Sequence, residues 1–299
     1  MKIAVLGSLE SWYVRDLRRA AEDRHEVLPV TFRRLRSQLT SRAASPDIAA
    51  ETSYFSDEAN LAQADAVLVR TMPPGSLEQV VLRMDVLGQL EAAGTLVVNP
   101  PRAIETAVDK YLATARLREA GLDIPATCVC QTCEDAMEAF ARLGGDVVVK
   151  PIFGAEGRGI TRLTDEALAL RAFKMLEQLG AVIYLQRFVE HEGGDLRLLV
   201  IGSRVLGMRR TNKLDWRTNV SRGAKTAPLE VSEELAELAL RAAAAVGAPL
   251  AGVDLLPGRD GRLYAIEVNG VPGWRALART LSVDVGRLVV EYLETMAAR

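Results

Sequence analysis

The sequence contains only two histidines, His25 and His191, and only three cysteines among its 299 residues. The cysteines, Cys128, Cys130 and Cys133, lie within six positions and have no histidine beside them, which disfavours both a zinc site and a disulfide framework. We expect them to be buried, reduced thiols. With two imidazoles in the chain, a metal centre based on histidine is also disfavoured.

Long apolar runs and an excess of one charge are missing as well. No apolar run approaches the roughly 20 residues that a membrane span needs. The opening residues MKIAVLGS enter a strand pattern without a secretory signal, so we expect a cytoplasmic protein with no membrane partner. A formal net charge of −2, from 37 basic and 39 acidic residues, gives no electrostatic basis for nucleic acid as a partner.

The first hundred residues alternate strand and helix patterns. Strand signals occur in KIAVLG, HEVLPV, ADAVLVR and TLVVN, and helical patterns cover 12–21 and 77–93. This alternation predicts a βαβ unit with a parallel sheet. Its first turn, Gly7-Ser8-Leu9-Glu10, lacks the G-x-G-x-x-G spacing of dinucleotide-binding folds, so we assign no nucleotide to this unit. Asn99-Pro100-Pro101 ends it, because consecutive prolines cannot continue a central strand.

A glycine-rich segment follows the strand pattern DVVVKP. A helical pattern from Ile104 to Ala120, which contains Lys110, comes before it, and the strand ends at Lys150. The next residues, PIFGAEGRGI, include Gly154, Gly157 and Gly159 and lead into a second strand. Because the lysine precedes the glycines, this is not a Walker A loop. The glycines allow close approach of backbone N–H groups to phosphates, although a plain flexible hairpin explains the spacing equally well.

Residues 251–274, AGVDLLPGRDGRLYAIEVNGVPGW, predict a β-hairpin that carries three oxygen ligands on one face. Asp260-Gly261 between alternating apolar runs indicates a two-residue turn, which would pair residue 254 with residue 267. Glu267 and Asn269 then share a face with Asp254, while Val253, Leu255, Ile266 and Val268 point the other way. Two facing carboxylates repel each other unless a cation lies between them, and this donor set suits magnesium. A solvated hairpin with outward polar residues is the alternative.

Cations gather just before this hairpin. The loop from Thr211 to Pro228 holds four basic residues, and the adjoining strands of the hairpin DLRLLVIGSRVLGMRR hold three more: Lys213, Arg217, Arg222, Lys225, Arg197, Arg209 and Arg210. A local anion site or a solvated loop would explain them. Further along, Ser232 is expected to cap a helix that ends at Gly247, and Ser282 to cap the last helix.

Taken in order, these motifs resemble the ATP-grasp superfamily over residues 100–299. D-K, V-V-K-P-x-x-G-x-x-G-x-G-I, D-x-R, N-x-x-R-G and E-V-N-x-x-P-G are all present, and within the superfamily the chain is most similar to the RimK-type α-L-glutamate ligases. The resemblance implies an α/β and α+β fold. A Rossmann-like N-terminal pre-ATP-grasp domain would span residues 1–100. The two ATP-grasp subdomains would span 101–185, with the glycine-rich flap, and 186–299, with the metal and acceptor site.

The resemblance also implies residue roles. ATP would be bound by the two lysines, the flap glycines, backbone near adenine, a ribose-binding aspartate and an asparagine: Lys110, Lys150, Gly154, Gly157, Gly159, Gln186, Arg187, Phe188, Val189, Asp195 and Asn219. Arg187 stands where relatives commonly have glutamate. Asp254, Glu267 and Asn269 would hold two Mg2+ ions, or Mn2+, with Glu267 bridging them. The catalytic arginines would be Arg222, Arg197 and Arg210, with Arg222 steadying an acyl phosphate.

The implied activity is an ATP-dependent ligase that joins L-glutamate to a carboxylate acceptor through an acyl phosphate. Such chemistry needs charge stabilisation and no nucleophilic Ser or Cys. Trp216 and Trp274, in loops that the family places beside its substrates, favour a flat pterin-type cofactor as acceptor, because aromatic faces stack on flat heterocycles. An amino-group carrier protein or a protein C-terminal tail is the alternative acceptor. A non-catalytic ATP-binding module is the alternative class, and the family suggests a homo-oligomer.

Overall fold

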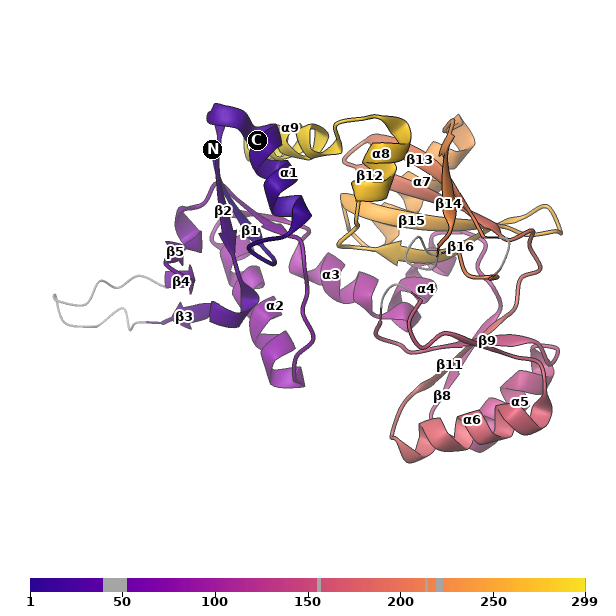
Figure 1. Cartoon of the computed structure of the whole chain (residues 1–299). Coiled ribbons are helices and arrows are strands. Elements are labelled where there is room, and N and C mark those ends of the chain that lie inside the picture. Colours follow the sequence, from indigo (N-terminus) through magenta and orange to yellow (C-terminus); the bar gives the residue numbers. More distant parts are fainter. Residues whose placement is uncertain (40–52, 155–156, 213–214, 219–222, 299) are drawn as a thin grey trace.

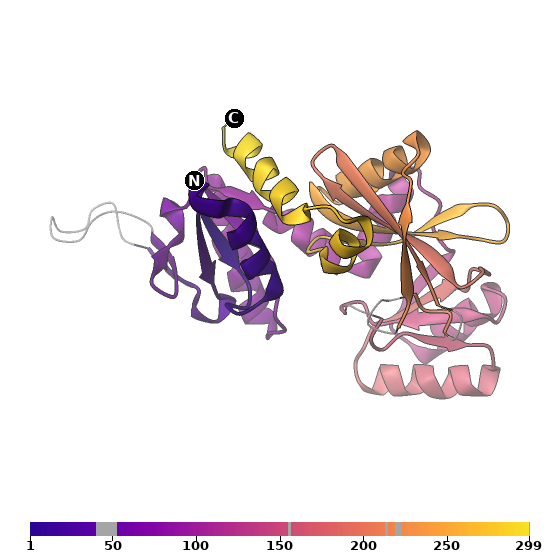
Figure 2. The same cartoon turned by 45° about the horizontal axis from the view of Figure 1, so that its top comes forward.

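The computed structural model describes residues 1–39, 53–154, 157–212, 215–218 and 223–298. The chain forms an N-terminal α/β unit and, beyond it, a smaller and a larger antiparallel sheet that lie against each other (Figures 1 and 2). No helix within the described ranges combines the length and apolar character needed to span a membrane.

The N-terminal unit is built on a parallel sheet in the strand order β2-β1-β6-β7, as the alternating pattern predicts. Buried aliphatic residues fill its strands, and Ser11 and Ser76 cap its two long helices. The sheet and its helices comprise β1 (Lys2–Leu6), α1 (Trp12–Ala21), β2 (Glu26–Val30), β6 (Ala66–Val69), α2 (Leu77–Ala92) and β7 (Leu96–Val98). Shorter elements lie beside them: η1 (Glu22–Arg24), η2 (Phe32–Arg34), η3 (Leu61–Gln63) and the small sheet β3 (Arg36–Gln38), β4 (Ser53–Ser56) and β5 (Ala59–Asn60).

The single helix expected over 104–120 is two helices, α3 (Pro101–Val108) and α4 (Lys110–Glu119). Asp109 interrupts them because its backbone is extended, with φ −84° and ψ 103°. Its carboxylate accepts hydrogen bonds from the backbone N–H groups of Tyr111 and Leu112 and so caps α4. Lys110 therefore occupies the first position of a helix instead of its middle.

The smaller sheet has the order β10-β9-β11-β8 and is antiparallel throughout. Its elements are β8 (Thr127–Cys130), β9 (Val147–Lys150), β10 (Thr161–Leu163) and β11 (Ile183–Arg187), covered by α5 (Cys133–Arg142) and α6 (Glu166–Gln178). The three cysteines are free thiols, as expected, but only Cys133 is buried in this core, and Cys128 and Cys130 pack against it half-buried. The expected boundary between residues 185 and 186 falls inside β11.

The larger sheet has the order β14-β13-β12-β15-β16 and packs against α7, α3 and α4. Its elements are β12 (Gly194–Ile201), β13 (Arg204–Thr211), β14 (Lys225–Leu229), α7 (Glu233–Ala245), β15 (Leu250–Pro257) and β16 (Leu263–Asn269). Ser232 caps α7, as expected. Ser282 does not cap the last helix. It ends α8 (Arg275–Leu281) in a left-handed conformation, and Asp284 caps α9 (Val285–Ala297).

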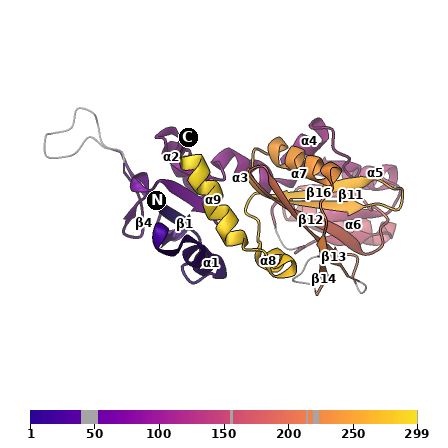
Figure 3. The ribbon, with the colours of Figure 1, turned by 90° about the horizontal axis from the view of Figure 1, so that it is seen from above.

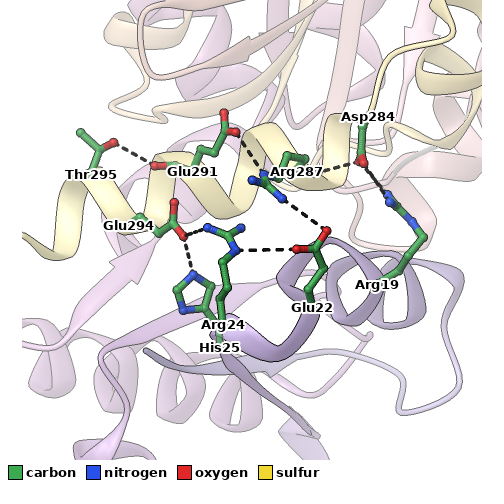
Figure 4. A network of polar contacts seen from close by, with 9 residues as sticks. All are labelled: Arg19, Glu22, Arg24, His25, Asp284, Arg287, Glu291, Glu294 and Thr295. Atoms are coloured by element: carbon green, nitrogen blue, oxygen red, sulfur yellow. Dashed lines mark hydrogen bonds and ion pairs between the residues drawn. The ribbon is translucent and has the colours of Figure 1, made fainter.

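The last helix, α9, returns to the N-terminal unit and lies along α1 (Figure 3). Val285, Val289, Val290 and Leu293 are buried in one apolar cluster with residues of β1 and α1. Figure 4 shows the polar rim of this contact, where Arg19 bonds Asp284 at 2.6 Å, Arg24 bonds Glu294 at 2.7 Å and His25 also contacts Glu294. Exposed ion pairs contribute little to the free energy of unfolding, so the apolar cluster is what holds α9 against the N-terminal unit.

Asn99 joins the N-terminal unit to the larger sheet. It is 1% exposed; its amide donates to the carbonyls of Leu250 (2.7 Å) and Gly270, and its Oδ1 accepts from the N–H of Leu250 (2.9 Å). Asn99→Leu is expected to destabilise the protein by about 3 kcal/mol or more, because three buried backbone groups lose their partner. Urea unfolding measures this loss.

The control for Asn99 is Asn60→Ala, because Asn60 only accepts one exposed hydrogen bond from Ala62 at the start of η3. Its expected cost is about 1 kcal/mol. An equal loss in free energy of unfolding for the two substitutions would contradict the role of Asn99 in joining the N-terminal unit to the larger sheet.

Candidate active site

The hairpin of β15 and β16 pairs Asp254 with Glu267, as the sequence predicts. The predicted two-residue turn is wrong, because the strands end at Pro257 and Leu263 and residues 258–262 form a longer loop. A β-bulge between Asp254 and Leu255 shifts the register by one residue and compensates for the longer loop. Ile266 lines the cavity described below, although it was predicted to lie with Val253, Leu255 and Val268 on the face opposite the ligands; the bulge accounts for the difference.

Two arginines from neighbouring strands hold Asp254. Arg197 of β12 bonds Oδ1 at 2.6 Å, and Arg210 of β13 lies 3.0 Å from Oδ2. Arg210 also donates to both oxygens of Asp195, at 2.7 and 2.5 Å. Burial by itself raises the pKa of Asp254, but the charges of Arg197 and Arg210 outweigh burial and leave this pKa below its ordinary value. The two arginines and the two aspartates, Asp195 and Asp254, are all buried, and their formal charges cancel.

The arginines weaken the case for a cation between Asp254 and Glu267. The Asp254 carboxylate facing Glu267 is neutralised in part by arginines, so repulsion between the two carboxylates does not by itself require a metal. Gly252 makes the arrangement possible, because a Cβ at this position would lie 2.4 Å from Nη2 of Arg197. Any larger residue would push that guanidinium away from Asp254.

The two lysines of the predicted phosphate site line the same cavity. Lys110 at the start of α4 donates to the carbonyl of Gly154 at 2.6 Å and has its Nζ 4.0 Å from Glu267. Lys150 at the end of β9 is 9% exposed and donates to Oε1 of Gln186 at 2.5 Å. Gly157 adopts a left-handed conformation, with φ 68°, where a side chain would be strained.

The cavity has a volume of about 120 Å³ and unites most of the predicted site residues. Those that line it are Lys110, Lys150, Gly154, Gly157, Gln186, Arg187, Phe188, Val189, Asp195, Arg210, Asp254 and Glu267. Gly159, Arg197 and Asn269 are absent from its lining. Asn219 and Arg222 lie outside the described residues. The cavity therefore gathers cations, carboxylates and glycine backbone from both sheets.

A family model, the RimK-like ATP-grasp domain, matches residues 107–293 of the chain. The chain belongs to the RimK-like ATP-grasp family. The tetrahydromethanopterin:alpha-L-glutamate ligase of Methanosarcina acetivorans is 30% identical over 318 residues, with 96% of each chain covered. A probable alpha-L-glutamate ligase of Picosynechococcus sp. is 31% identical over 304 residues, covering 100% of this chain and 97% of the relative.

The fold of this RimK-like protein is also that of solved ATP-grasp ligases. The structure of the ATP-grasp ligase PsnB, complexed with a phosphomimetic variant of its minimal precursor, Mg and ADP, aligns with a TM-score of 0.75 at 26% identity. The alignment covers 99% of this chain and 98% of PsnB. The protein is therefore an ATP-dependent ligase of the ATP-grasp fold.

The oxygen donors of this RimK-like site fit a magnesium ion. Glu267 has a 35% exposed side chain, and among the described residues its carboxylate pairs only with Lys110, 4.0 Å away, so its oxygens are available. Asp254 has one guanidinium partner on each oxygen and retains lone pairs, and Asn269 uses one lone pair of Oδ1 for the N–H of Val271. In the described ranges no three His, Cys, Asp or Glu residues are grouped to hold a metal, so a magnesium site here would need the Asn269 amide as its third donor.

Burial lowers the pKa of Lys150 in this RimK-like site to about 8, although Glu267 and Asp254 act to raise it. Phosphates bind the protonated amine better, so nucleotide affinity is expected to fall as pH rises through 8. If the bound lysine stays protonated, the ATP dissociation constant at pH 9 should be about ten times that at pH 7. Calorimetric titration over this range measures it.

The matched variant for this pH dependence is Lys150→Met, which removes the titrating amine. It should bind ATP more weakly and with the same affinity at pH 7 and pH 9. An unaltered protein whose affinity does not change with pH would contradict a phosphate contact by Lys150.

The two tryptophans predicted to stack on the acceptor, Trp216 and Trp274, differ in their surroundings. Trp216 lies in the cavity wall, with its ring centroid 5.8 Å from that of Phe188, the residue predicted to lie at adenine. Trp274 is 0% exposed; it donates to Asp16 at 2.9 Å and packs 4.0 Å from the Arg70 guanidinium. The predicted stacking of Trp274 on an acceptor is therefore wrong, because its faces are covered by the N-terminal unit.

Sequence reasoning also missed several residues of the cavity wall. His191, Thr218, Leu256 and Ile266 line it, and Thr218 donates to Asp195. His191 follows the strand β11 and is one of two histidines, which was an available signal. The others carry no motif, because their place depends on the bulge and on loop paths that strand alternation does not encode.

Proposed function

We propose that this ligase adds L-glutamate to the carboxylate of a small pterin-type cofactor, with ATP bound in the cavity lined by Lys110 and Lys150. The observation that carries the proposal is the convergence of both lysines with Asp254 and Glu267 on one cavity. A carboxylate of the acceptor would attack the γ-phosphate of ATP, forming an acyl phosphate and releasing ADP. The amine of glutamate would then displace phosphate from the acyl phosphate to form an amide.

The described residues divide this chemistry between them. Lys110 and Lys150 would hold the phosphates, and backbone from Gln186 to Val189 would hold adenine, as the cavity lining allows. Asp254, Glu267 and Asn269 would hold two magnesium ions, for which manganese could substitute, and these would neutralise charge on the transferred phosphoryl group. Arg222 is proposed for the acyl phosphate from its sequence motif alone.

Arg197 and Arg210 are proposed in a revised role. Both bond Asp254, so they would fix the orientation of this metal ligand and offset its charge. Arg210 also lines the cavity, where it could contact phosphate oxygens. Asp195 is proposed to take the ribose hydroxyls, with its carboxylate already oriented by Arg210 and Thr218.

The choice of acceptor rests on relatives, because Trp274 no longer supports it. Two relatives that match almost the whole chain, in Methanosarcina acetivorans and Methanococcus maripaludis, are named tetrahydromethanopterin:alpha-L-glutamate ligases. The solved structures favour a second candidate, a protein or peptide tail, because PsnB is complexed with a precursor peptide.

The test is to incubate purified protein with ATP, magnesium and L-glutamate, together with either a tetrahydromethanopterin-type cofactor or acidic peptide tails. Mass spectrometry should find the mass of a glutamyl residue added to the cofactor. Glutamate on peptide only would overturn the cofactor assignment and leave the ligase chemistry. ATP binding without amide product on any acceptor of the panel would favour the non-catalytic module.

A further inference from the structure

A line of buried polar side chains crosses the wall behind Lys150. Its amine donates to Oε1 of Gln186, and Nε2 of Gln186 donates to the hydroxyl of Tyr184 at 2.8 Å. The Tyr184 hydroxyl in turn bonds Oγ1 of Thr114 at 2.8 Å. Gln186 is 2% exposed and Tyr184 is 1% exposed. Polar groups so deeply buried are costly unless every one has a partner, and here each has one.

The orientation of the Gln186 amide follows from these partners. Thr127 donates its hydroxyl proton to the carbonyl of Pro125 at 2.7 Å, so toward Gln186 its oxygen can only accept. Nε2 of Gln186 therefore points at Thr127, 3.0 Å away, and at Tyr184. This leaves Oε1 facing Lys150. A flipped amide would turn its NH2 group toward the ammonium and lose the bond to Thr127.

The same line of hydrogen bonds ends on α4, the helix that carries the second lysine, Lys110. Thr114 lies one turn after Lys110 on α4, whose Ala113 and Leu117 are buried in the core of the larger sheet. Tyr184 and Gln186 lie on β11 in the smaller sheet, next to Lys150 on β9. The bond between Tyr184 and Thr114 therefore joins α4, which carries Lys110, to β11, which pairs with the strand that carries Lys150.

We propose that Tyr184 and Gln186 are positioning residues that set Lys150 and Lys110 for the phosphates of ATP. The proposal rests on the nucleotide site argued above and extends it to a hydroxyl that does not line the cavity. Gln186 orients the Lys150 amine, and Tyr184 both locks Gln186 and fixes α4 against β11 through Thr114.

The test is the ATP affinity of Tyr184→Phe, which removes only the hydroxyl. The ATP dissociation constant should rise about five- to thirtyfold, as expected when a hydrogen bond to an oriented group is lost. Tyr264→Phe is the matched control, because Tyr264 is also buried and donates its hydroxyl to Asp260 at 2.6 Å in the hairpin loop. The control should leave ATP affinity unchanged. Thr114→Val removes the hydrogen bond to Tyr184 from the α4 side. It should weaken ATP binding in the same way, which keeps the test available if Tyr184→Phe folds poorly.

A thermodynamic cycle separates positioning from a general effect on the fold. In a Lys150→Met background, Tyr184→Phe should weaken ATP binding much less than in the unaltered protein, because the amine that it positions is gone. An equal loss in both backgrounds would overturn the proposal, and so would unchanged affinity of Tyr184→Phe and Thr114→Val. An unaltered protein that binds no ATP would instead overturn the nucleotide site, and the inference with it.

Discussion

Replacement of Glu267 by glutamine is expected to lower turnover by at least about a hundredfold while the fold stays intact. Glu267 faces Asp254 across the hairpin and lies 4.0 Å from Lys110, with oxygens free for a metal. The amide keeps the shape of the side chain but removes the charge that would bind magnesium and neutralise it. Magnesium-dependent ADP release in the presence of glutamate and acceptor measures the effect.

The control for this substitution is Glu105→Gln. Glu105 has a 37% exposed side chain, close to the 35% of Glu267, and pairs with Arg102 on α3. Its replacement should change neither turnover nor the magnesium requirement. Near-normal magnesium-dependent turnover of Glu267→Gln would remove Glu267 from the metal site.

Arg210→Met is expected to destabilise the folded protein by roughly 3–5 kcal/mol, the cost of breaking a buried ion pair from one side. Arg210 bonds both oxygens of Asp195 and lies 3.0 Å from Asp254, so its loss leaves two buried carboxylates with one remaining guanidinium, that of Arg197. Chemical denaturation at pH 7 measures the change in the free energy of unfolding.

The pH dependence gives a second readout for Arg210→Met. Carboxylates left unpaired in a buried site have raised pKa values, so they take up protons as pH falls. The folded variant then binds protons that the unfolded chain does not yet bind. Its loss in free energy of unfolding, relative to the unaltered protein, should therefore shrink from pH 7 toward pH 5. Arg262→Met is the control: Arg262 is 60% exposed and bonds Asp260 in the hairpin loop, so its loss should cost less than about 1 kcal/mol.

Alternating strand and helix patterns predicted the parallel N-terminal sheet, and a turn at Asp260-Gly261 between alternating apolar runs predicted the pairing of Asp254 with Glu267. The second prediction is correct although the turn was wrong, because the longer loop and the β-bulge each shift the register by one residue in opposite directions. A bulge has no simple sequence signal here, so the position of Ile266 in the cavity wall could not be predicted.

A local cap and several long-range contacts account for the other differences. Asp109 reads as one more helical residue until its carboxylate is seen to cap α4. Trp274 lies close in sequence to Glu267, yet it is buried against Asp16 and Arg70, which are about two hundred or more positions away. The line from Lys150 to Thr114 likewise depends on three separate segments, and no local pattern indicates it.

The return of α9 to the N-terminal unit affects how the protein can fold during synthesis. Val289, Val290 and Leu293 share a buried cluster with Ile3, Val5 and other residues that leave the ribosome hundreds of positions earlier. Until α9 is made, that face of α1 and of the sheet has no apolar cover, although domains generally fold in the order of their synthesis. This unit is therefore translated before the two antiparallel sheets but completed after them, and its nascent form should present an apolar surface to chaperones.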